Sequence, residues 1–286
     1  MDDRPDSERT AFRAACVQMR SGIDRARNVD AAVTLINEAA QKGAHFIVTP
    51  EMTNAVDKDA GRLCASLPEG EDIDEVKAFA EAASENGVWL LIGSMAIGRG
   101  DGKLANRAFL FGPDGEIAAR YDKIHMFDVN LENGESWRES RVYHPGSAAV
   151  VVDTPLARFG LSICYDVRFP YLYRAMARAG AEVFCVPAAF TRQTGRAHWK
   201  TLLAARAIEC GAFVIAAAQG GAHEDGRETF GHSLIVSPWG DILAEARGDE
   251  PGVILAEIDP SRVAAARRQI PNLALETPFK VLNVET

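Results

Sequence analysis

The sequence predicts an α/β domain with mixed sheets, and three observations lead to this fold class. Apolar runs of strand length alternate with amphipathic helical segments along most of the 286 residues, the pattern of strands joined by helices. Glycines lie close after the predicted helices, as expected where helices end, at Gly43, Gly87, Gly180 and Gly211. No Ser/Pro-rich linker or change of composition divides the chain, so we predict one domain over residues 11–286 behind a short flexible tail at 1–10.

The first half of the chain begins with a strand in which small and apolar residues alternate. Apolar side chains recur at helical spacing over 28–42 and 72–86, which predicts two amphipathic helices. Each helix leads into a mostly apolar run that is typical of a buried strand, and the turn at 112–115 is a strong hairpin signal. The predicted strands of this half are 12–19, 44–49, 88–93, 106–111 and 116–120.

The second half resumes this alternation after a long loop. Residues 128–148 show little periodicity and contain Gly134, Pro145 and Gly146, so we predict a loop of the kind that often carries function. Residues 157–162 read as a hairpin turn that runs into a buried strand. The remaining predicted helices are 171–178, 198–209 and 262–269, and the remaining predicted strands are 181–187, 213–218, 233–236, 241–245 and 252–258.

Composition excludes several classes of protein. Hydrophobic residues make up 47% and charged residues 25%, the balance of an ordinary soluble enzyme. The formal net charge of -9, without any basic run, argues against a nucleic-acid partner. No apolar run is long enough to predict a membrane span, and the polar N-terminus does not resemble a signal peptide. The 5 cysteines include no C-x-x-C pair and suit a reducing compartment, so we predict a cytoplasmic location.

Three polar side chains follow three different predicted strands: Glu51, Lys123 and Cys164. Taken singly, each has an ordinary explanation. A lone cysteine in an apolar run is usually a small buried residue, and a glutamate or lysine in a loop is usually solvated. Strand ends are rigid and the loops that they feed carry function, so the three residues together favour a site.

These three residue types suit nucleophilic catalysis. A thiol with its ordinary pKa of about 8.5 is only a few per cent ionised at neutral pH. A neighbouring carboxylate can accept the thiol proton during attack, and a neighbouring ammonium can lower the thiol pKa. In an enclosed site we expect Glu51 to have a raised pKa suited to general base catalysis, and Lys123 to hold the pKa of Cys164 down.

The stretches around these residues resemble the signature regions of a known family. Pro-Glu at 50–51, Lys-Ile-His at 123–125 and Cys-Tyr-Asp-Val-Arg-Phe-Pro at 164–170 are similar, in order and spacing, to the signatures of the nitrilase superfamily, the carbon–nitrogen hydrolases. Further matches lie at 145–146, 194–199, 205–209 and 231–233. The resemblance covers roughly residues 12–270, and the branch it most resembles is the ω-amidase and deaminated-glutathione amidase group.

The resemblance implies a four-layer α-β-β-α sandwich with a Glu-Lys-Cys triad. Carried over, Glu51 is the general base, Lys123 stabilises the tetrahedral intermediate and Cys164 is the nucleophile. The backbone N–H of Tyr165 completes the oxyanion site. A second glutamate is typical of the family, and Glu139 matches it better than the two other glutamates of the same loop, Glu132 and Glu135.

Further side chains are assigned beside this triad. Phe190 and Thr191, at the end of the strand over 181–187, are expected to contribute to oxyanion or substrate binding. Arg168 could bind a substrate carboxylate, although we favour an intramolecular or interfacial salt bridge for it. His198 and Trp199 are expected to open a helix and to have a structural role.

We therefore predict a thiol amidohydrolase that cleaves the C–N bond of a small carboxamide, releasing acid and ammonia through a thioester on Cys164. By resemblance, the substrate is an ω-amide of a dicarboxylic or α-keto acid. The 6 histidines are scattered, so we predict no metal centre, and no organic cofactor is needed. The partners implied are a small-molecule amide and further copies of the chain, in a homodimer or a larger homo-oligomer.

Alternatives stay open. The same thioester chemistry would serve a nitrile hydrolase, an N-carbamoyl hydrolase or an amine acyltransferase of the same superfamily. From a different class, the chain could be a catalytically silent ligand-binding or scaffold subunit. Residues 273–277 depart from the basic, proline-containing tail of the branch, which puts tail contacts across an oligomer in doubt. The exact substrate and the oligomer size are not predicted.

Overall fold

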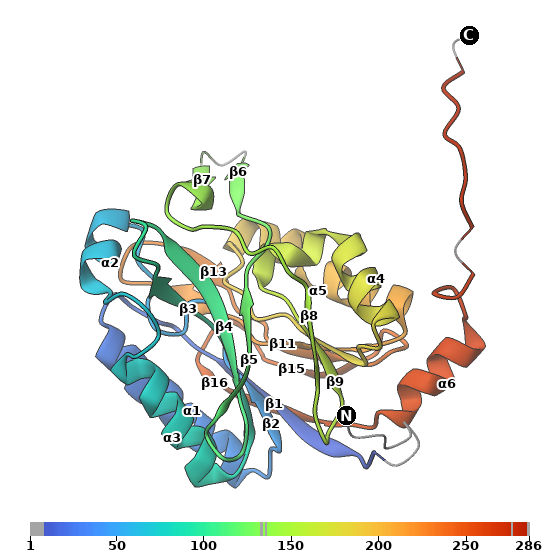
Figure 1. Ribbon diagram of the computed structural model, residues 1–286, viewed down its shortest axis with the longest axis horizontal. Helices are drawn as coiled ribbons and strands as arrows, with labels where there is room; N and C mark the ends of the chain where they lie inside the picture. Colours follow the sequence, from blue (N-terminus) through green and yellow to red (C-terminus); the bar gives the residue numbers. More distant parts are fainter. Residues whose placement is uncertain (1–8, 132–133, 135, 276, 285–286) are drawn as a thin grey trace.

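Two six-stranded mixed sheets stack face to face, with helices on their outer faces (Figure 1). The computed structural model describes residues 9–131, 134, 136–275 and 277–284. The first sheet has the order β16 (Gly252–Ile258), β1 (Phe12–Gln18), β2 (Phe46–Val48), β3 (Trp89–Gly98), β4 (Leu104–Phe111) and β5 (Ile117–Asp122). The second has the order β15 (Ile242–Glu245), β14 (Leu234–Val236), β11 (Phe213–Ala216), β10 (Val183–Cys185), β9 (Arg158–Leu161) and β8 (Val150–Asp153).

Parallel strands in each sheet require crossover connections, and helices supply them. β2 pairs in parallel with β1 and β3, and β10 pairs in parallel with β9 and β11. α1 and α3 pack together on the first sheet, whereas α4 and α5 pack together on the second, which confirms the predicted four-layer sandwich. The described α-helices are α1 (Arg25–Gln41), α2 (Ala60–Ser66), α3 (Asp74–Asn86), α4 (Pro170–Arg178), α5 (Arg192–Cys210) and α6 (Ser261–Gln269).

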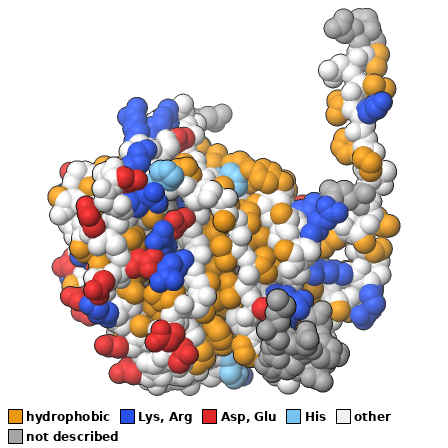
Figure 2. Space-filling view, viewed as in Figure 1, with side chains coloured by type: hydrophobic (Ala, Val, Ile, Leu, Met, Phe, Trp, Pro, Cys, Tyr) orange, Lys and Arg blue, Asp and Glu red, His pale blue; other side chains and the backbone are white. Residues whose placement is uncertain are grey.

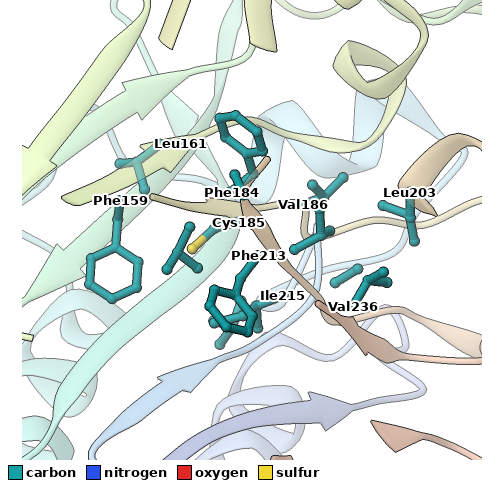
Figure 3. Close-up of a cluster of buried hydrophobic side chains, with 14 of the residues drawn as sticks. Phe159, Leu161, Phe184, Cys185, Val186, Leu203, Phe213, Ile215 and Val236 are labelled. Atoms are coloured by element: carbon teal, nitrogen blue, oxygen red, sulfur yellow. The ribbon is translucent and has the colours of Figure 1, made fainter. Parts of the chain in front are cut away.

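A hydrophobic core joins the two sheets. The ring of Phe46 on β2 stacks on the ring of Phe159 on β9, with 4.0 Å between the ring centroids. Figure 3 shows part of this core, where side chains of β9, β10, β11 and α5 gather. A second cluster fills the space between the first sheet and helices α1 and α3. Because the central strands are buried on both faces, their sequences are nearly continuous apolar runs.

The predicted helix ends are confirmed at two left-handed glycines. Gly87 ends α3 with φ +61° and Gly211 ends α5 with φ +53°. In both caps the glycine N–H hydrogen-bonds carbonyls of the preceding turn. Glycine adopts this backbone conformation without the steric cost that a Cβ atom imposes, so the sequence signal has a direct physical basis.

The described residues of the range 128–148 contain more regular structure than the loop that we predicted. β6 (Asp128–Asn130) pairs with β7 (Ser136–Arg138) in an antiparallel two-stranded sheet, and a 3₁₀ turn, Glu139–Arg141, follows. Strands this short have no readable periodicity, so the pairing was missed. The same reason applies to β8 and to the hairpin of β12 (Gly220–Ala222) and β13 (Glu228–Phe230).

Helix α5 begins at Arg192, well before the start that we predicted at residue 198. The Thr191 side chain accepts a hydrogen bond from the N–H of Thr194 and so caps the helix. His198 and Trp199 therefore lie inside the helix rather than at its start. Trp199 is buried and its indole N–H donates to the carbonyl of His232, as expected of a structural residue.

The two chain ends differ in their contacts. Most of the predicted flexible tail at 1–10 lies outside the described residues, and Arg9 forms ion pairs with Asp153 and Glu182. After α6 the chain runs away from the sheets (Figure 1), and Phe279 and Leu282 are 87% and 80% exposed. No helix in the described part of the chain is long and apolar enough to cross a membrane.

Candidate active site

The predicted site residues meet where strands of the two sheets end. Glu51 follows β2 and Lys123 follows β5 in the first sheet, and Cys164 follows β9 in the second. All three are buried, at 3%, 2% and 7% exposure. Parallel strands bring their carboxyl ends to one edge of a sheet, which is why residues far apart in sequence converge there.

Cys164 lies at the start of a 3₁₀ turn, Cys164–Arg168, in a strained backbone conformation with φ +51°. Its N–H donates to the carbonyl of Pro187 at 2.8 Å. Tyr165, predicted to supply an oxyanion N–H, is the next residue of the turn. The first N–H groups of a helical turn have no partner within it, so this one is suited to a ligand oxygen.

Asp166 holds this turn in place, and it was not recognised in the sequence. Its fully buried carboxylate accepts hydrogen bonds from the Ile163 N–H at 2.9 Å and the Tyr121 hydroxyl at 2.6 Å. It also accepts from the backbone N–H of His125 at 3.0 Å. Asp166 thereby ties the turn that carries Cys164 to the segment that carries Lys123.

Glu51 is the most connected of the three residues. Its Oε1 accepts from the Lys123 Nζ at 2.7 Å and from the Asn106 Nδ2 at 3.0 Å. Its Oε2 accepts from the backbone N–H of Ala189, in the segment between β10 and α5, at 2.9 Å. The Cys164 side chain interacts with the same carboxylate. Glu51 therefore contacts both the cation and the thiol of the predicted triad.

Glu139 joins the same cluster, from the 3₁₀ turn that follows β7. Both of its oxygens contact the Lys123 Nζ, at 3.0 and 2.8 Å. Its Oε2 also accepts from the Phe127 N–H at 2.6 Å. The structure thus brings Glu139 into the site, as predicted, while the alternatives Glu132 and Glu135 lie outside the described residues.

Asn106, on β4, is a site residue that the sequence reading missed. Its Nδ2 donates to Oε1 of Glu51 and to Oε1 of Glu139, at 3.0 Å in each case. The side chain is fully buried, and its Oδ1 has no partner among the described residues. The available signal was an amide within an otherwise apolar strand, because a buried polar group needs partners.

The electrostatics of the site differ from our expectation. Burial raises the pKa of the Cys164 thiol, and the Glu51 carboxylate adds to the rise, so the pKa lies well above its ordinary value despite Lys123. Burial opposes ionisation of Glu51, but the charge of Lys123 and hydrogen bonds hold the pKa of this carboxyl below its ordinary value. The predicted raised pKa for Glu51 and lowered pKa for Cys164 are therefore wrong.

Lys123 is fully charged in this setting. Burial opposes its charge, but the carboxylates of Glu139 and Glu51 raise its pKa well above the ordinary value. The resting site therefore combines a neutral thiol, an ionised Glu51 and a protonated Lys123. In this state Glu51 can accept the thiol proton as the sulfur attacks.

A cavity of about 470 Å³ opens over these side chains. Tyr165, Phe190 and Thr191 line it, as expected of substrate-contacting residues, although the Thr191 hydroxyl also caps α5. Arg168 lines it too. It forms no intramolecular salt bridge among the described residues, and the interfacial salt bridge that we also considered stays a prediction. Its guanidinium instead packs 5.8 Å from the Tyr165 ring centroid and 5.3 Å from that of Phe190, with His198 Nδ1 at 3.3 Å.

Metal-binding side chains are not gathered in the described part of the chain: no group of three or more His, Cys, Asp or Glu residues there is arranged to hold a metal ion. The histidines nearest the site are used otherwise. His125 stacks on Phe169 with 3.6 Å between centroids, and its Nδ1 lies 2.6 Å from Asp166. The reactive and charged groups that line the cavity are its thiol, carboxylates and cations.

Comparison with known proteins agrees with this geometry. The carbon–nitrogen hydrolase family model matches residues 13–268. The deaminated glutathione amidase of Synechocystis is 40% identical over 274 residues, covering 92% of this chain and 97% of the relative. Human omega-amidase NIT2 is 35% identical over 262 residues, covering 92% and 94%. The crystal structure of the C. elegans NitFhit protein superposes with a TM-score of 0.86 at 34% identity, covering 94% of this chain and 65% of that one. The chain therefore belongs to the carbon–nitrogen hydrolase family, and it is a carbon–nitrogen amidohydrolase.

Proposed function

We propose that Cys164 is the nucleophile, Glu51 the general base and Lys123 the electrostatic stabiliser of the reaction. Glu51 accepts the thiol proton while the sulfur attacks the amide carbonyl carbon. The oxyanion that forms is stabilised by the Lys123 ammonium and the backbone N–H of Tyr165. Glu51 then returns the proton to the leaving nitrogen, the C–N bond breaks, and the acyl group stays on Cys164 as a thioester.

Water completes the cycle. Glu51, again ionised, accepts a proton from water as the oxygen attacks the thioester carbonyl. The C–S bond breaks, the acid leaves and the thiol regains its proton from Glu51. Glu139 contacts Lys123 rather than the thiol, so its role is to hold the ammonium charged and oriented. The observation that carries the proposal is the contact of one carboxylate, Glu51, with Lys123 and Cys164 inside a buried site.

The substrate class that we propose is an ω-amide of a short dicarboxylic or α-keto acid. Arg168 supports this class, because its guanidinium lines the cavity without an ion pair among the described residues. A carboxylate at the non-reacting end of the acyl group would supply the missing anion. The names of the relatives, deaminated glutathione amidase and omega-amidase, point to the same class.

A panel of ω-amides tests the activity. Hydrolysis of α-ketoglutaramate is followed by ammonia release, and hydrolysis of deaminated glutathione is followed by detection of the released amine. Cys164→Ala is expected to abolish turnover of every amide that the parent protein cleaves. Cys64→Ala, which changes a cysteine of α2, is the matched control and is expected to keep full activity. Turnover that survives in Cys164→Ala would disprove the thioester mechanism.

Product analysis separates the alternatives. A nitrile and an N-carbamoyl amino acid are offered beside an amide, and an added amine tests acyl transfer. Intact-mass detection of an acyl adduct on Cys164 tests the thioester intermediate directly. Failure to label Cys164 with any amide or electrophile would contradict its role as the nucleophile.

We also propose that the chain forms a homodimer or larger homo-oligomer. Figure 2 shows hydrophobic side chains along the projecting C-terminal segment, where Leu275, Phe279 and Val284 are 69%, 87% and 81% exposed. Apolar side chains at this exposure are typical of a surface that a partner covers, and a second copy is the proposed partner. Light scattering of the full chain and of a chain ending at residue 272 tests this. The cytoplasmic location stays a prediction from the cysteine pattern, and cell fractionation would test it.

A further inference from the structure

His125 and Asp166 have corresponding places beside two of the reactive residues. His125 lies two residues after Lys123, and Asp166 lies two residues after Cys164. The Nδ1 atom of His125 lies 2.6 Å from Oδ1 of Asp166, and the backbone N–H of His125 donates to the same oxygen at 3.0 Å. Neither side chain lines the cavity. The pair therefore joins the Lys123 segment to the Cys164 turn outside the space that the substrate is proposed to fill.

The contacts of the pair determine which nitrogen of His125 donates. Oδ1 of Asp166 faces His125, and Oδ2 accepts from the Ile163 N–H and the Tyr121 hydroxyl. Because a carboxylate can only accept hydrogen bonds, Nδ1 of His125 must be the donor. In neutral imidazole Nε2 is then the acceptor, and the hydroxyl of Tyr171 can donate to it. The ring is thus held at both nitrogens, with one N–H directed at Asp166.

The backbone of Cys164 needs support because it is strained. Its φ of +51° lies in the left-handed region, which residues with a Cβ atom rarely adopt. One support is the hydrogen bond from the Cys164 N–H to the carbonyl of Pro187 at 2.8 Å. A second comes from Asp166, whose Oδ2 accepts from the N–H of Ile163 at 2.9 Å. Such strain persists only where the surrounding structure fixes it, so the orientation of the nucleophile depends on Asp166.

Lys123 is attached to the other sheet. It follows β5, and its backbone N–H donates to the carbonyl of Asn106 on β4 at 3.0 Å. The turn that carries Cys164 follows β9 of the second sheet. The hydrogen bonds from His125 to Asp166 therefore connect segments that belong to different sheets. Because they do so two residues away from the reactive groups, they constrain the separation of the ammonium and the thiol.

We propose that His125 and Asp166 act together as positioning residues for the reaction. Their hydrogen bonds set how the thiol of Cys164 lies relative to the ammonium of Lys123. The N–H of Tyr165 belongs to the same turn as Cys164, so its direction toward the oxyanion is set as well. Misplacing reacting groups by about 1 Å can lower a rate by about 100-fold, so the pair affects kcat rather than substrate affinity. This inference rests on the proposed roles of Cys164 and Lys123.

Two replacements of His125 separate its hydrogen bond from its packing. The ring stacks on Phe169 with 3.6 Å between the ring centroids. His125→Phe keeps a ring on Phe169 but has no donor for Asp166, whereas His125→Asn can place an amide N–H where Nδ1 lies but gives up the stack. We expect kcat to fall by about 10- to 100-fold in His125→Phe and by less than about threefold in His125→Asn. KM should stay within about threefold of the wild-type value in both variants.

A packing role for His125 predicts the opposite order of the two variants. If kcat falls no further in His125→Phe than in His125→Asn, the positioning role is overturned. His45→Phe is the matched control and should keep the wild-type kcat. His45 is exposed, precedes β2 at the end of that strand opposite to Glu51, and does not line the cavity. Urea denaturation of each variant shows that the protein being measured is folded.

Alkylation of Cys164 by iodoethanol, a small neutral reagent, tests the same geometry without a substrate. In the wild type, burial and Glu51 keep the pKa of the thiol well above its ordinary value, so the reaction should accelerate only at strongly alkaline pH. Asp166→Asn replaces an acceptor oxygen by a donor and frees the turn. The thiol then gains solvent contact, and we expect the pH of half-maximal rate to fall toward about 8.5. His125→Phe should give a smaller shift in the same direction, and Cys164→Ala gives the background from the other cysteines.

The alkylation profile separates this inference from the proposed function. If Cys164→Ala retains turnover, the proposed catalytic roles fail, yet a shifted profile in the variants still supports positioning of the thiol by His125 and Asp166. If Cys164→Ala is inactive but the profile of folded His125→Phe matches that of the wild type, only the positioning role fails. This second result is decisive even where Asp166→Asn does not fold.

Discussion

Charged groups are paired differently in two parts of the site. We call Glu51, Lys123, Glu139 and Cys164 the catalytic floor, and the part of the lining that carries Arg168 and Arg227 the cavity wall. On the floor, the one ammonium lies within 3.0 Å of both carboxylates, and all three groups are buried or nearly so. Among the described residues of the wall, Arg168 has ring and imidazole neighbours instead of an acid, and the buried Nε of Arg227 has no hydrogen-bond partner.

This difference teaches which charges serve the chemistry and which serve recognition. A buried charge without a partner is strongly destabilising, so floor charges must be matched within the protein before any substrate arrives. Matched and fixed charges are also what preorganised stabilisation of an oxyanion requires. The arginines of the wall are incompletely paired among the described residues, which leaves them capacity to bind a ligand. The comparison predicts that floor mutations change kcat and stability, whereas wall mutations change KM.

Replacing Lys123 should have the largest effect on this comparison. Lys123→Met leaves Glu51 and Glu139 buried without a cation, so we expect unfolding to become easier by about 3–5 kcal/mol. Loss of the oxyanion stabiliser should lower kcat by about 10²- to 10³-fold or more. Chemical denaturation and steady-state kinetics measure both, with Lys200→Met, at an exposed lysine of α5, as the control. An unchanged kcat in folded Lys123→Met would place the stabilising role elsewhere.

Replacing Arg168 should give an intermediate effect confined to binding. Arg168→Gln removes the proposed partner of the acyl carboxylate, and we expect KM to rise by about 10- to 100-fold for every α-ketoglutarate amide. A neutral amide of similar length, such as valeramide, should be cleaved as by the wild type, and unfolding should be unchanged. A fall in kcat for valeramide would show that Arg168 belongs to the floor.

The pH profile should show the smallest effect, and it follows from the direction of the Glu51 shift. Because the folded pKa of Glu51 is lowered, its ionised form is kept as pH falls through the ordinary glutamate value of about 4.3 and is lost only below it. The stabilisation that ionised Glu51 contributes is fully present above the pKa that this carboxyl has in the unfolded chain. It is lost as the pH falls through the lower pKa of the folded state. We expect kcat/KM to keep its acid limb below about pH 4.3.

The same profile in Lys123→Met should move its acid limb to higher pH, because burial then raises the Glu51 pKa without an opposing cation. Samples returned from acid to neutral pH control for irreversible unfolding. A wild-type acid limb near pH 6 would contradict the lowered pKa of Glu51.

Local signals in the sequence determined much of the fold. Gly87 and Gly211 marked helix ends because their left-handed backbone conformation is a property of the residue itself. Apolar runs marked strands such as β2 and β10, because burial on both faces leaves few polar positions. Glu51, Lys123 and Cys164 could be grouped from the sequence because each follows a strand, and the motifs around them resemble those of one family.

Only the tertiary structure decided how these groups affect one another. The pKa directions of Glu51 and Cys164 depend on burial and on the distance to Lys123, and neither is encoded locally. Asn106 became a site residue because β4 places its amide between two carboxylates that come from other elements. Arg227 and Trp137 stack on each other although they come from a hairpin and from a short strand that show no sequence periodicity. Chemistry-bearing residues can be identified one by one, but charge balance and recognition are properties of contacts between distant segments.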